Sequence, residues 1–158
     1  MNALLTFAQA IPLKLDIYYH AVEKYHLLEH ECKLLNYEKF VEGIPEGTLD
    51  RIHSCPWGEP VQISDRFTLY KEEADFRSMK PSPNINLVYF DVFSPDKQAK
   101  LWSPEIIGAI GQVSEQGAIL VTYSSKGIVR RALISCGFKV FKVTGPPGKI
   151  EMVRAIKR

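Results

Sequence analysis

The sequence predicts an α/β protein in which a mostly parallel sheet is flanked by helices, and three observations support this. Residues 87–90, after Asn86, are a continuous apolar run of strand length, which is typical of a strand covered on both faces. Strand-like and helix-like segments alternate along the chain. Several strand-like segments end in an acidic residue, here Asp91, and ligands of open α/β sheets bind at the carboxyl ends of strands. An Asp that only caps the next turn is the alternative.

Length and composition fit one domain spanning residues 1–158, with 46% hydrophobic and 24% charged residues. No apolar run reaches the length of a membrane span, and the first residues do not resemble a signal peptide, so we expect a cytoplasmic protein. The three cysteines, Cys32, Cys55 and Cys136, are far apart and form no C-x-x-C pair. This argues against a disulfide framework and a zinc finger, and we expect the cysteines to be reduced and buried.

Charge is distributed unevenly. Residues 124–158 contain nine Lys and Arg but one acid, Glu151, and the preceding 123 residues sum to about −6. A polyanionic partner, with nucleic acid as the first candidate, is the favoured interpretation, and a basic tail that only solubilises the chain is the alternative.

In the first half of the chain, the pattern predicts a helix that stops at Ile11-Pro12, a strand that ends before Glu23-Lys24, and loops with a short helix around Trp57. A second helix follows the first strand, and a second strand precedes an acidic stretch that includes Asp75. The expected ranges are helix 1–10, strand 13–22, helix 25–35 and strand 66–71.

In the second half, Ser103, Pro104 and Glu105 form a typical helix start, with Ser as the N-cap. The expected elements are a helix over 103–113, a strand over 118–123, a helix from Ser124 or Ser125 that ends at Cys136-Gly137, and two last strands over 138–143 and 150–156. The loop between these last strands suits an antiparallel hairpin.

Four motifs carry a resemblance to a known family. Residues 91–95 together with Trp102 resemble the D-G-F-x-P…W signature of the tRNA 5-aminomethyl-2-thiouridine methyltransferases, which are the MnmD proteins and the N-terminal half of bifunctional MnmC. Residues 122–133 resemble the family's T-x-x-S-x-G-x-V-R-R-x-L segment, and residues 136–138 and 145–152 resemble its A-G-F and G-x-x-x-K-x-E-M endings. The resemblance covers nearly the whole chain and implies a Rossmann-like class I methyltransferase sheet with a C-terminal antiparallel hairpin.

The resemblance also implies roles for individual residues. S-adenosyl-L-methionine is the expected cofactor and tRNA the expected partner, and no metal is expected. Asp91 is the expected catalytic residue, since a carboxylate can orient an amine and take up its proton. The residues expected at the cofactor are Glu23 and Lys24 at the ribose, Ala74 and Asp75 at the adenine, and Asp91. Those expected at the RNA are Phe93, Pro95, Trp102, Ser125, Lys126, Arg130, Arg131 and Lys149. For the aromatic and Arg residues, the alternatives are core packing and a solvated helix face.

Two departures from the family pattern stand out. The family opens with a strand and a glycine-rich turn, and the helix that follows this turn resembles Asn2-Ala3-Leu4-Leu5. We therefore expect the sheet to lack its usual first strand and these 158 residues to show little activity. Val92 stands where the family has Gly, which narrows the space beside Asp91. A non-catalytic fragment or paralogue that binds RNA or a protein partner is therefore the alternative function.

Residues 26–30 also fit the pattern H-x-x-E-H, which places two histidines one helical turn apart beside a carboxylate. Short patterns of this kind recur by chance, and no third ligand stands out downstream. We interpret the segment as a polar helix face without a metal ion.

Overall fold

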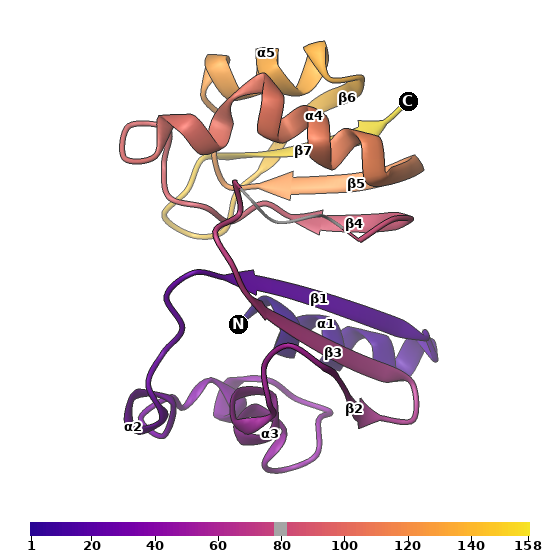
Figure 1. Cartoon of the computed structure of the whole chain (residues 1–158), viewed down its shortest axis with the longest axis vertical. Helices are drawn as coiled ribbons and strands as arrows, with labels where there is room; N and C mark the ends of the chain where they lie inside the picture. The colour runs from indigo at the N-terminus through magenta and orange to yellow at the C-terminus, as the bar shows by residue number, and fades with distance from the viewer. Residues whose placement is uncertain (78–81) are drawn as a thin grey trace. The chain divides into compact units, whose positions relative to one another are not determined.

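A computed structural model describes residues 1–77 and 82–158 (Figure 1). The chain divides into two compact units, Met1–Met79 and Lys80–Arg158, which are described one at a time. The interpretation of residues 1–158 as one domain stays a prediction.

The first unit is a three-stranded sheet with helices. Its elements are α1 (Asn2–Leu13), β1 (Ile17–Glu23), α2 (Glu29–Cys32), the 3-10 helix η1 (Tyr37–Phe40), α3 (Thr48–Ser54), β2 (Pro60–Ser64) and β3 (Phe67–Glu73). The strand order is β1-β3-β2, with β1 parallel and β2 antiparallel to β3. Its core joins α1, α3 and the sheet through Leu4, Phe7, Leu49, Ile52, Cys55, Ile63, Phe67 and Leu69. Apolar side chains from three sequence-distant elements therefore form one core.

Helix α1 continues past the predicted stop and includes Pro12. A proline in a helix interior removes one backbone hydrogen bond, but here it stands in the last turn, where its fixed φ is still compatible with the helix. Lys14 then ends the helix in the left-handed conformation (φ 53°), and its N–H donates to the carbonyls of Ala10 and Ile11. The predicted helix is confirmed and its predicted end is wrong by one turn.

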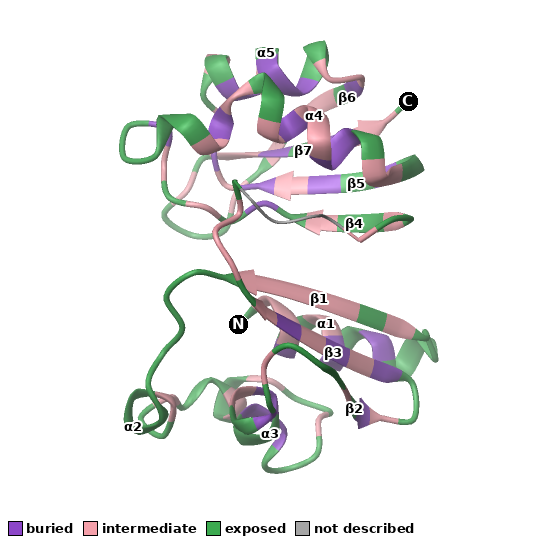
Figure 2. Cartoon of the chain, viewed as in Figure 1, coloured by how far each residue is buried: buried purple, intermediate pink, exposed green. Residues whose placement is uncertain are grey.

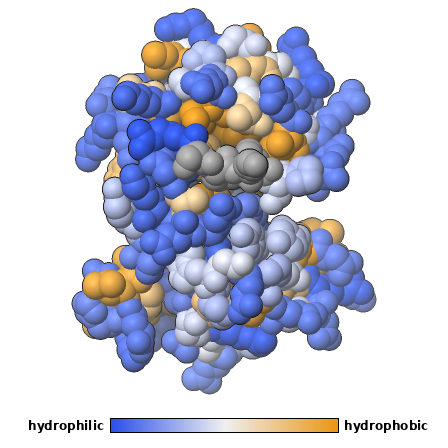
Figure 3. Space-filling model, in the orientation of Figure 1, coloured by the Kyte–Doolittle hydropathy of each residue, from blue (hydrophilic) through white to orange (hydrophobic). Residues whose placement is uncertain are grey.

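The helix predicted over residues 25–35 is wrong for most of its length, because only Glu29–Cys32 is helical and none of these four residues is buried. The Leu28 N–H donates to Oε2 of Glu31 at 2.7 Å, which starts the helix after His26. A longer helix here would need its apolar residues to pack against the core. The leucines around α2 stay exposed instead, as the apolar patch near α2 in Figure 3 shows, so the helix remains short. His26 thus lies outside the helix and contacts Glu73 and Trp57 instead of pairing with His30.

Strand β2 was not expected from the sequence, since Pro56, Gly58 and Pro60 indicated a loop. It pairs antiparallel with β3 across a tight turn at Asp65-Arg66, and the register shifts between Gln62 and Ser64. Pro60 is tolerated because it opens a strand at the end of its sheet, where its missing N–H interrupts little of the ladder.

Lys71 is a buried lysine on β3 that caps helix α3. Its Nζ donates to the carbonyl oxygens of Ile52 (3.1 Å) and His53 (2.7 Å) and lies 4.9 Å from the centre of the Trp57 ring. Burial, followed by the charges of the N-terminus and of Lys71, lowers the pKa of His53. The ammonium therefore donates to two carbonyls at the C-terminal end of α3, of which that of Ile52 also accepts from Sγ of Cys55 at 3.3 Å.

Replacing Lys71 with Met is expected to lower the free energy of unfolding by about 1–3 kcal/mol, because the shape is kept while the carbonyls of Ile52 and His53 lose the charged donor of Lys71. Urea unfolding followed by circular dichroism measures the change. Lys33→Met is the matched control, since Lys33 forms an exposed ion pair with Glu29 and its replacement should leave stability nearly unchanged. Equal effects of the two substitutions would contradict the capping role.

The second unit is a four-stranded sheet with two helices. Its elements are β4 (Ile85–Tyr89), the 3-10 helix η2 (Ala99–Trp102), α4 (Pro104–Val113), β5 (Ser114–Thr122), α5 (Gly127–Ser135), β6 (Phe138–Thr144) and β7 (Glu151–Lys157). The order is β4-β5-β7-β6, with β4 parallel to β5 and the other neighbours antiparallel. The predicted hairpin is therefore confirmed as β6 and β7, and Ser103 caps α4 by accepting from the N–H of Ile106.

The α/β class is confirmed, but the expectation of one mostly parallel sheet is wrong, because the described strands form two sheets that both contain antiparallel pairs. The expectation that β4 is covered on both faces is also wrong within this unit. Helices α4 and α5 cover one face, on which Leu120 and Val153 are buried, while Leu87 on the other face is 44% exposed (Figure 2). Successive side chains of a strand point to opposite faces of the sheet, so one set is buried under the helices while the other set is exposed.

The three cysteines are free thiols, but only Cys55 is buried, whereas Cys32 and Cys136 are half-buried. The expectation that all three are buried is therefore wrong for two of them. Within residues 1–77 and 82–158, no helix has the length and apolar character that crossing a membrane requires.

Candidate functional site

The sequence predicts cofactor contacts at Glu23, Lys24, Ala74 and Asp75, and the first unit brings these four residues together. Strands β1 and β3 are parallel neighbours with Glu23 paired to Glu73, so both strands end at the same edge of the sheet. The Ala74 N–H donates to the Glu23 carbonyl at 3.2 Å, and Nζ of Lys24 donates to Oδ2 of Asp75 at 3.0 Å. Segments 50 residues apart in sequence thus form one polar cluster.

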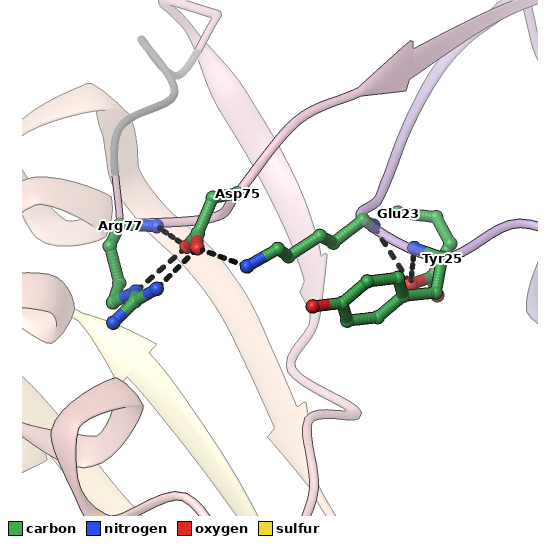
Figure 4. Close-up of polar contacts among 5 residues, drawn as sticks. Glu23, Tyr25, Asp75 and Arg77 are labelled. Atoms are coloured by element: carbon green, nitrogen blue, oxygen red, sulfur yellow. Dashed lines mark hydrogen bonds and ion pairs between the residues drawn. The ribbon is translucent and has the colours of Figure 1, made fainter.

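Glu23 is held in a single orientation by the backbone that follows it. Its Oε1 accepts from the N–H of Lys24 at 2.8 Å and from the N–H of Tyr25 at 3.0 Å (Figure 4). These donors stabilise the charged carboxylate and turn the chain at the end of β1. A carboxylate fixed in this way is suited to accept hydrogen bonds from a diol such as a ribose.

Asp75 is the most strongly paired acid of the cluster. Its Oδ1 accepts from the backbone N–H of Arg77 at 3.0 Å and from the Arg77 Nε at 2.9 Å, while Lys24 contacts Oδ2 (Figure 4). The Arg77 hydrogen bonds, followed by that of Lys24, hold the pKa of the Asp75 carboxyl far below its usual range. Arg77 was missed in the sequence, although an Asp two residues before an Arg is a common turn arrangement.

In the second unit, Asp91 lies two residues beyond the end of β4, as the sequence predicts, and is exposed. The preceding Phe90 still pairs with the sheet through its N–H, which donates to the Val121 carbonyl at 2.9 Å. Next to it, the hydroxyl of Tyr123 donates to the Val92 carbonyl at 2.9 Å. The backbone on both sides of Asp91 is therefore anchored to β5 and to the residue that follows β5.

Trp102, which is expected at the RNA with core packing as the alternative, is buried and does not offer a ring face to a base. The side chain is 2% exposed, packs edge-on against Phe90 with ring centres 5.0 Å apart, and donates from Nε1 to the Phe93 carbonyl at 2.9 Å. The Trp102 side chain therefore packs in the core beside the Asp91 turn and holds the turn by this hydrogen bond, as the core-packing alternative predicts. Phe93, by contrast, is 64% exposed, with Nζ of Lys97 5.9 Å from its ring centre. Pro95 is buried.

The predicted RNA-binding residues differ in how freely their charges are available. Lys126, which precedes α5, forms an ion pair with Asp96, and Lys149 lies over the ring of Tyr123 at 4.9 Å. Arg131 is exposed, whereas Arg130 and Ser125 are half-buried. The Arg130 Nε is itself buried without a hydrogen-bond partner among the described residues. Lys126 and Lys149 thus contact residues next to the Asp91 turn, and the guanidinium of Arg131 is the most exposed charge among Lys126, Lys149, Arg130 and Arg131 for which no ion pair is described.

The chemistry of the first unit fits part of an S-adenosyl-L-methionine molecule. Glu23 offers a fixed, solvent-exposed carboxylate for ribose hydroxyls. Asp75 fits an adenine amino group less well, because Arg77 and Lys24 already occupy its oxygens, so an adenine would have to share that carboxylate. Within the described ranges, no group of three or more His, Cys, Asp or Glu side chains is arranged to hold a metal ion.

Known proteins resemble this chain over most of its length. The chain is 31% identical, over 94% of its residues, to the tRNA 5-methylaminomethyl-2-thiouridine biosynthesis bifunctional protein MnmC of Nitrosospira multiformis, and 29% identical over 93% of its residues to the protein of the same name in Paracidovorax citrulli. It spans 25% and 22% of those two proteins. Its fold matches half of the crystal structure of MNMC2 from Aquifex aeolicus, with a TM-score of 0.66, 22% identity and 97% of this chain covered.

The family model that describes an S-adenosyl-L-methionine-dependent methyltransferase matches residues 59–158. This range contains Asp75, the Asp91 turn, Tyr123 and the C-terminal hairpin, so the match includes most of the site residues described above. The chain therefore belongs to the S-adenosyl-L-methionine-dependent methyltransferase family.

Proposed function

We propose that the chain transfers a methyl group from S-adenosyl-L-methionine to the aminomethyl group of a modified wobble uridine in tRNA, converting 5-aminomethyl-2-thiouridine to 5-methylaminomethyl-2-thiouridine. The names of the MnmC relatives, which refer to tRNA 5-methylaminomethyl-2-thiouridine biosynthesis, support this substrate. A cytoplasmic location, where tRNA is modified, is part of the proposal.

The observation that carries the proposal is the exposed Asp91 carboxylate on a turn anchored by Tyr123 and Trp102. S-adenosyl-L-methionine supplies an electrophilic methyl group on a positively charged sulfur. An amine attacks such a methyl only with its lone pair free and in line, so positioning contributes most of the acceleration. Asp91 accepts a hydrogen bond from the amine, orients it, and takes up the proton that the nitrogen loses.

Other residues bind the RNA. The exposed Phe93 ring offers a flat apolar face on which an unstacked uracil can stack. Arg131, Arg130, Lys126 and Lys149 provide positive charge for phosphates of the anticodon stem, and Ser125 offers a hydroxyl donor beside them. Pro95 keeps the turn rigid from its buried position.

The experiment that tests the function supplies the purified chain with S-adenosyl-L-methionine labelled in its methyl group and with two tRNAs. One tRNA carries 5-aminomethyl-2-thiouridine at the wobble position, and the other carries 2-thiouridine, which lacks the amine. Label recovered as 5-methylaminomethyl-2-thiouridine from the first tRNA alone is expected, at a low rate, in keeping with the little activity expected of these 158 residues. Binding of both tRNAs without label in either would favour the non-catalytic alternative.

Glu23→Gln is expected to weaken the binding of S-adenosyl-L-methionine about tenfold, because an amide loses the charge that strengthens hydrogen bonds to ribose hydroxyls. Isothermal titration of the chain with the cofactor measures the affinity. Glu73→Gln is the matched control, because Glu73 pairs with Glu23 across the same two strands and its carboxylate contacts only His26 among the described contacts. Similar losses in both variants would indicate a general charge effect and contradict the ribose contact.

A further inference from the structure

We propose that Tyr123 is a positioning residue for the turn that carries Asp91, a role that rests on the proposed function of Asp91. Tyr123 directly follows strand β5, the parallel neighbour of β4, and therefore lies beside the turn that follows β4. Its hydroxyl donates to the carbonyl of Val92, the residue immediately after Asp91. The family motif places an aromatic residue inside a longer pattern, whereas the hydroxyl contact comes from the structure alone.

The turn is held at two consecutive carbonyls. Tyr123 donates to the Val92 carbonyl at 2.9 Å, and Trp102 donates from its indole nitrogen to the Phe93 carbonyl at 2.9 Å. One donor directly follows β5 and the other ends η2, so the peptide groups after Asp91 are fixed from two directions. Rotation of these peptides would break one or both hydrogen bonds, and the direction of the Asp91 side chain depends on them.

Tyr123 is itself held in place by the loop between β6 and β7. Nζ of Lys149 lies 4.9 Å from the centre of the Tyr123 ring, which is the geometry of a cation–π contact. The loop is closed by hydrogen bonds from the Gly145 N–H to the Ile150 carbonyl and from the Lys149 N–H to the Pro146 carbonyl. A Cβ atom at Gly145 would clash with the Lys149 carbonyl oxygen, so this tight loop requires glycine there.

The hydroxyl is kept protonated and therefore able to donate. Burial, followed by the negative charge of Asp91, raises the pKa of the Tyr123 hydroxyl, and Lys126 opposes this only in part. Because the folded pKa is raised, the hydrogen bond to Val92 is fully present below the ordinary tyrosine pKa of about 10 and is lost only as the pH rises through the higher folded value. The anchor is therefore intact throughout the neutral range.

Tyr123→Phe removes the hydroxyl and keeps the ring that contacts Lys149. We expect the turnover number for methyl transfer to tRNA to fall about tenfold, while the KM values for tRNA and cofactor change less than about twofold. Hydrogen exchange, followed by mass spectrometry, should accelerate in the peptide that contains residues 91–98. Tyr18→Phe is the matched control, since Tyr18 is an exposed tyrosine of β1, and it should change neither readout.

The outcomes separate the two proposals. If the original chain does not methylate tRNA, the proposed function has failed, and faster exchange in Tyr123→Phe would still show that the hydroxyl anchors the turn. If the chain is active and Tyr123→Phe keeps the full turnover number, the positioning role is overturned while the function stands. Unchanged exchange in residues 91–98 would overturn the anchor in either case.

Discussion

Replacing Asp91 with Asn is expected to lower the turnover number for methyl transfer to tRNA by about a hundredfold or more, while the affinity for tRNA changes by less than about threefold. The amide keeps the size of the carboxylate and its place beyond β4, but it does not take up a proton or stabilise the ammonium that forms on methylation. Single-turnover transfer of labelled methyl groups measures the chemical step, and filter binding measures the affinity.

Glu105→Gln is the matched control for Asp91→Asn. Glu105 is an exposed acid in the first turn of α4, in the same unit as Asp91. Its replacement removes the same charge and should leave turnover unchanged within about twofold. Near-normal turnover of Asp91→Asn would refute the catalytic role of Asp91, and equal losses in both variants would show that total charge, not position, matters.

The second large expected effect is the dependence of tRNA affinity on salt concentration. If the basic C-terminal third binds tRNA phosphates, affinity for tRNA should fall roughly a hundredfold or more between about 50 and 200 mM salt. Arg130→Gln, Arg131→Gln and Lys149→Gln should each reduce the slope of log affinity against log salt by about 0.7–0.9, since each removes at most one phosphate contact. Lys126→Gln should change the slope less, because Asp96 already neutralises its charge.

Lys142→Gln is the control for the salt experiment. Lys142 belongs to the same basic third, but it is paired with Glu151 across the hairpin at 2.8 Å, so its replacement should leave the slope unchanged. A slope near zero in the original chain would contradict an electrostatic RNA interface. Equal changes for Lys142 and Arg131 would show that net charge alone governs binding.

Parts of the fold that depend on neighbouring residues could be predicted from the sequence, whereas parts that depend on residues far apart in the sequence could not. The N-cap of α4 at Ser103, the end of α5 near Gly137 and the hairpin of β6 and β7 were predicted correctly, because caps, glycine turns and alternating strands are specified by neighbouring residues. The helix over residues 25–35 was predicted wrongly, because its apolar residues match a helical pattern but most of them, such as Leu28 and Leu34, stay exposed.

The candidate site shows the same division. Asp91, Glu23 and Asp75 could be found in the sequence because acids that end strands converge on a sheet edge. The contacts of the Tyr123 hydroxyl with the Val92 carbonyl and of the Trp102 indole with the Phe93 carbonyl could not be found in this way, because no spacing rule specifies the geometry of side-chain contacts between distant residues.

By itself, the sequence determined the α/β class, the order of most elements, the basic C-terminal third and the acids at the strand ends, since each depends on local periodicity, capping or charge along the chain. Only the tertiary structure decided that the strands form two sheets, that Lys71 caps α3 and that the Asp91 turn is anchored at two carbonyls. These features depend on which distant groups become neighbours once the apolar faces are buried, and buried polar groups then take whichever partners that packing brings within reach.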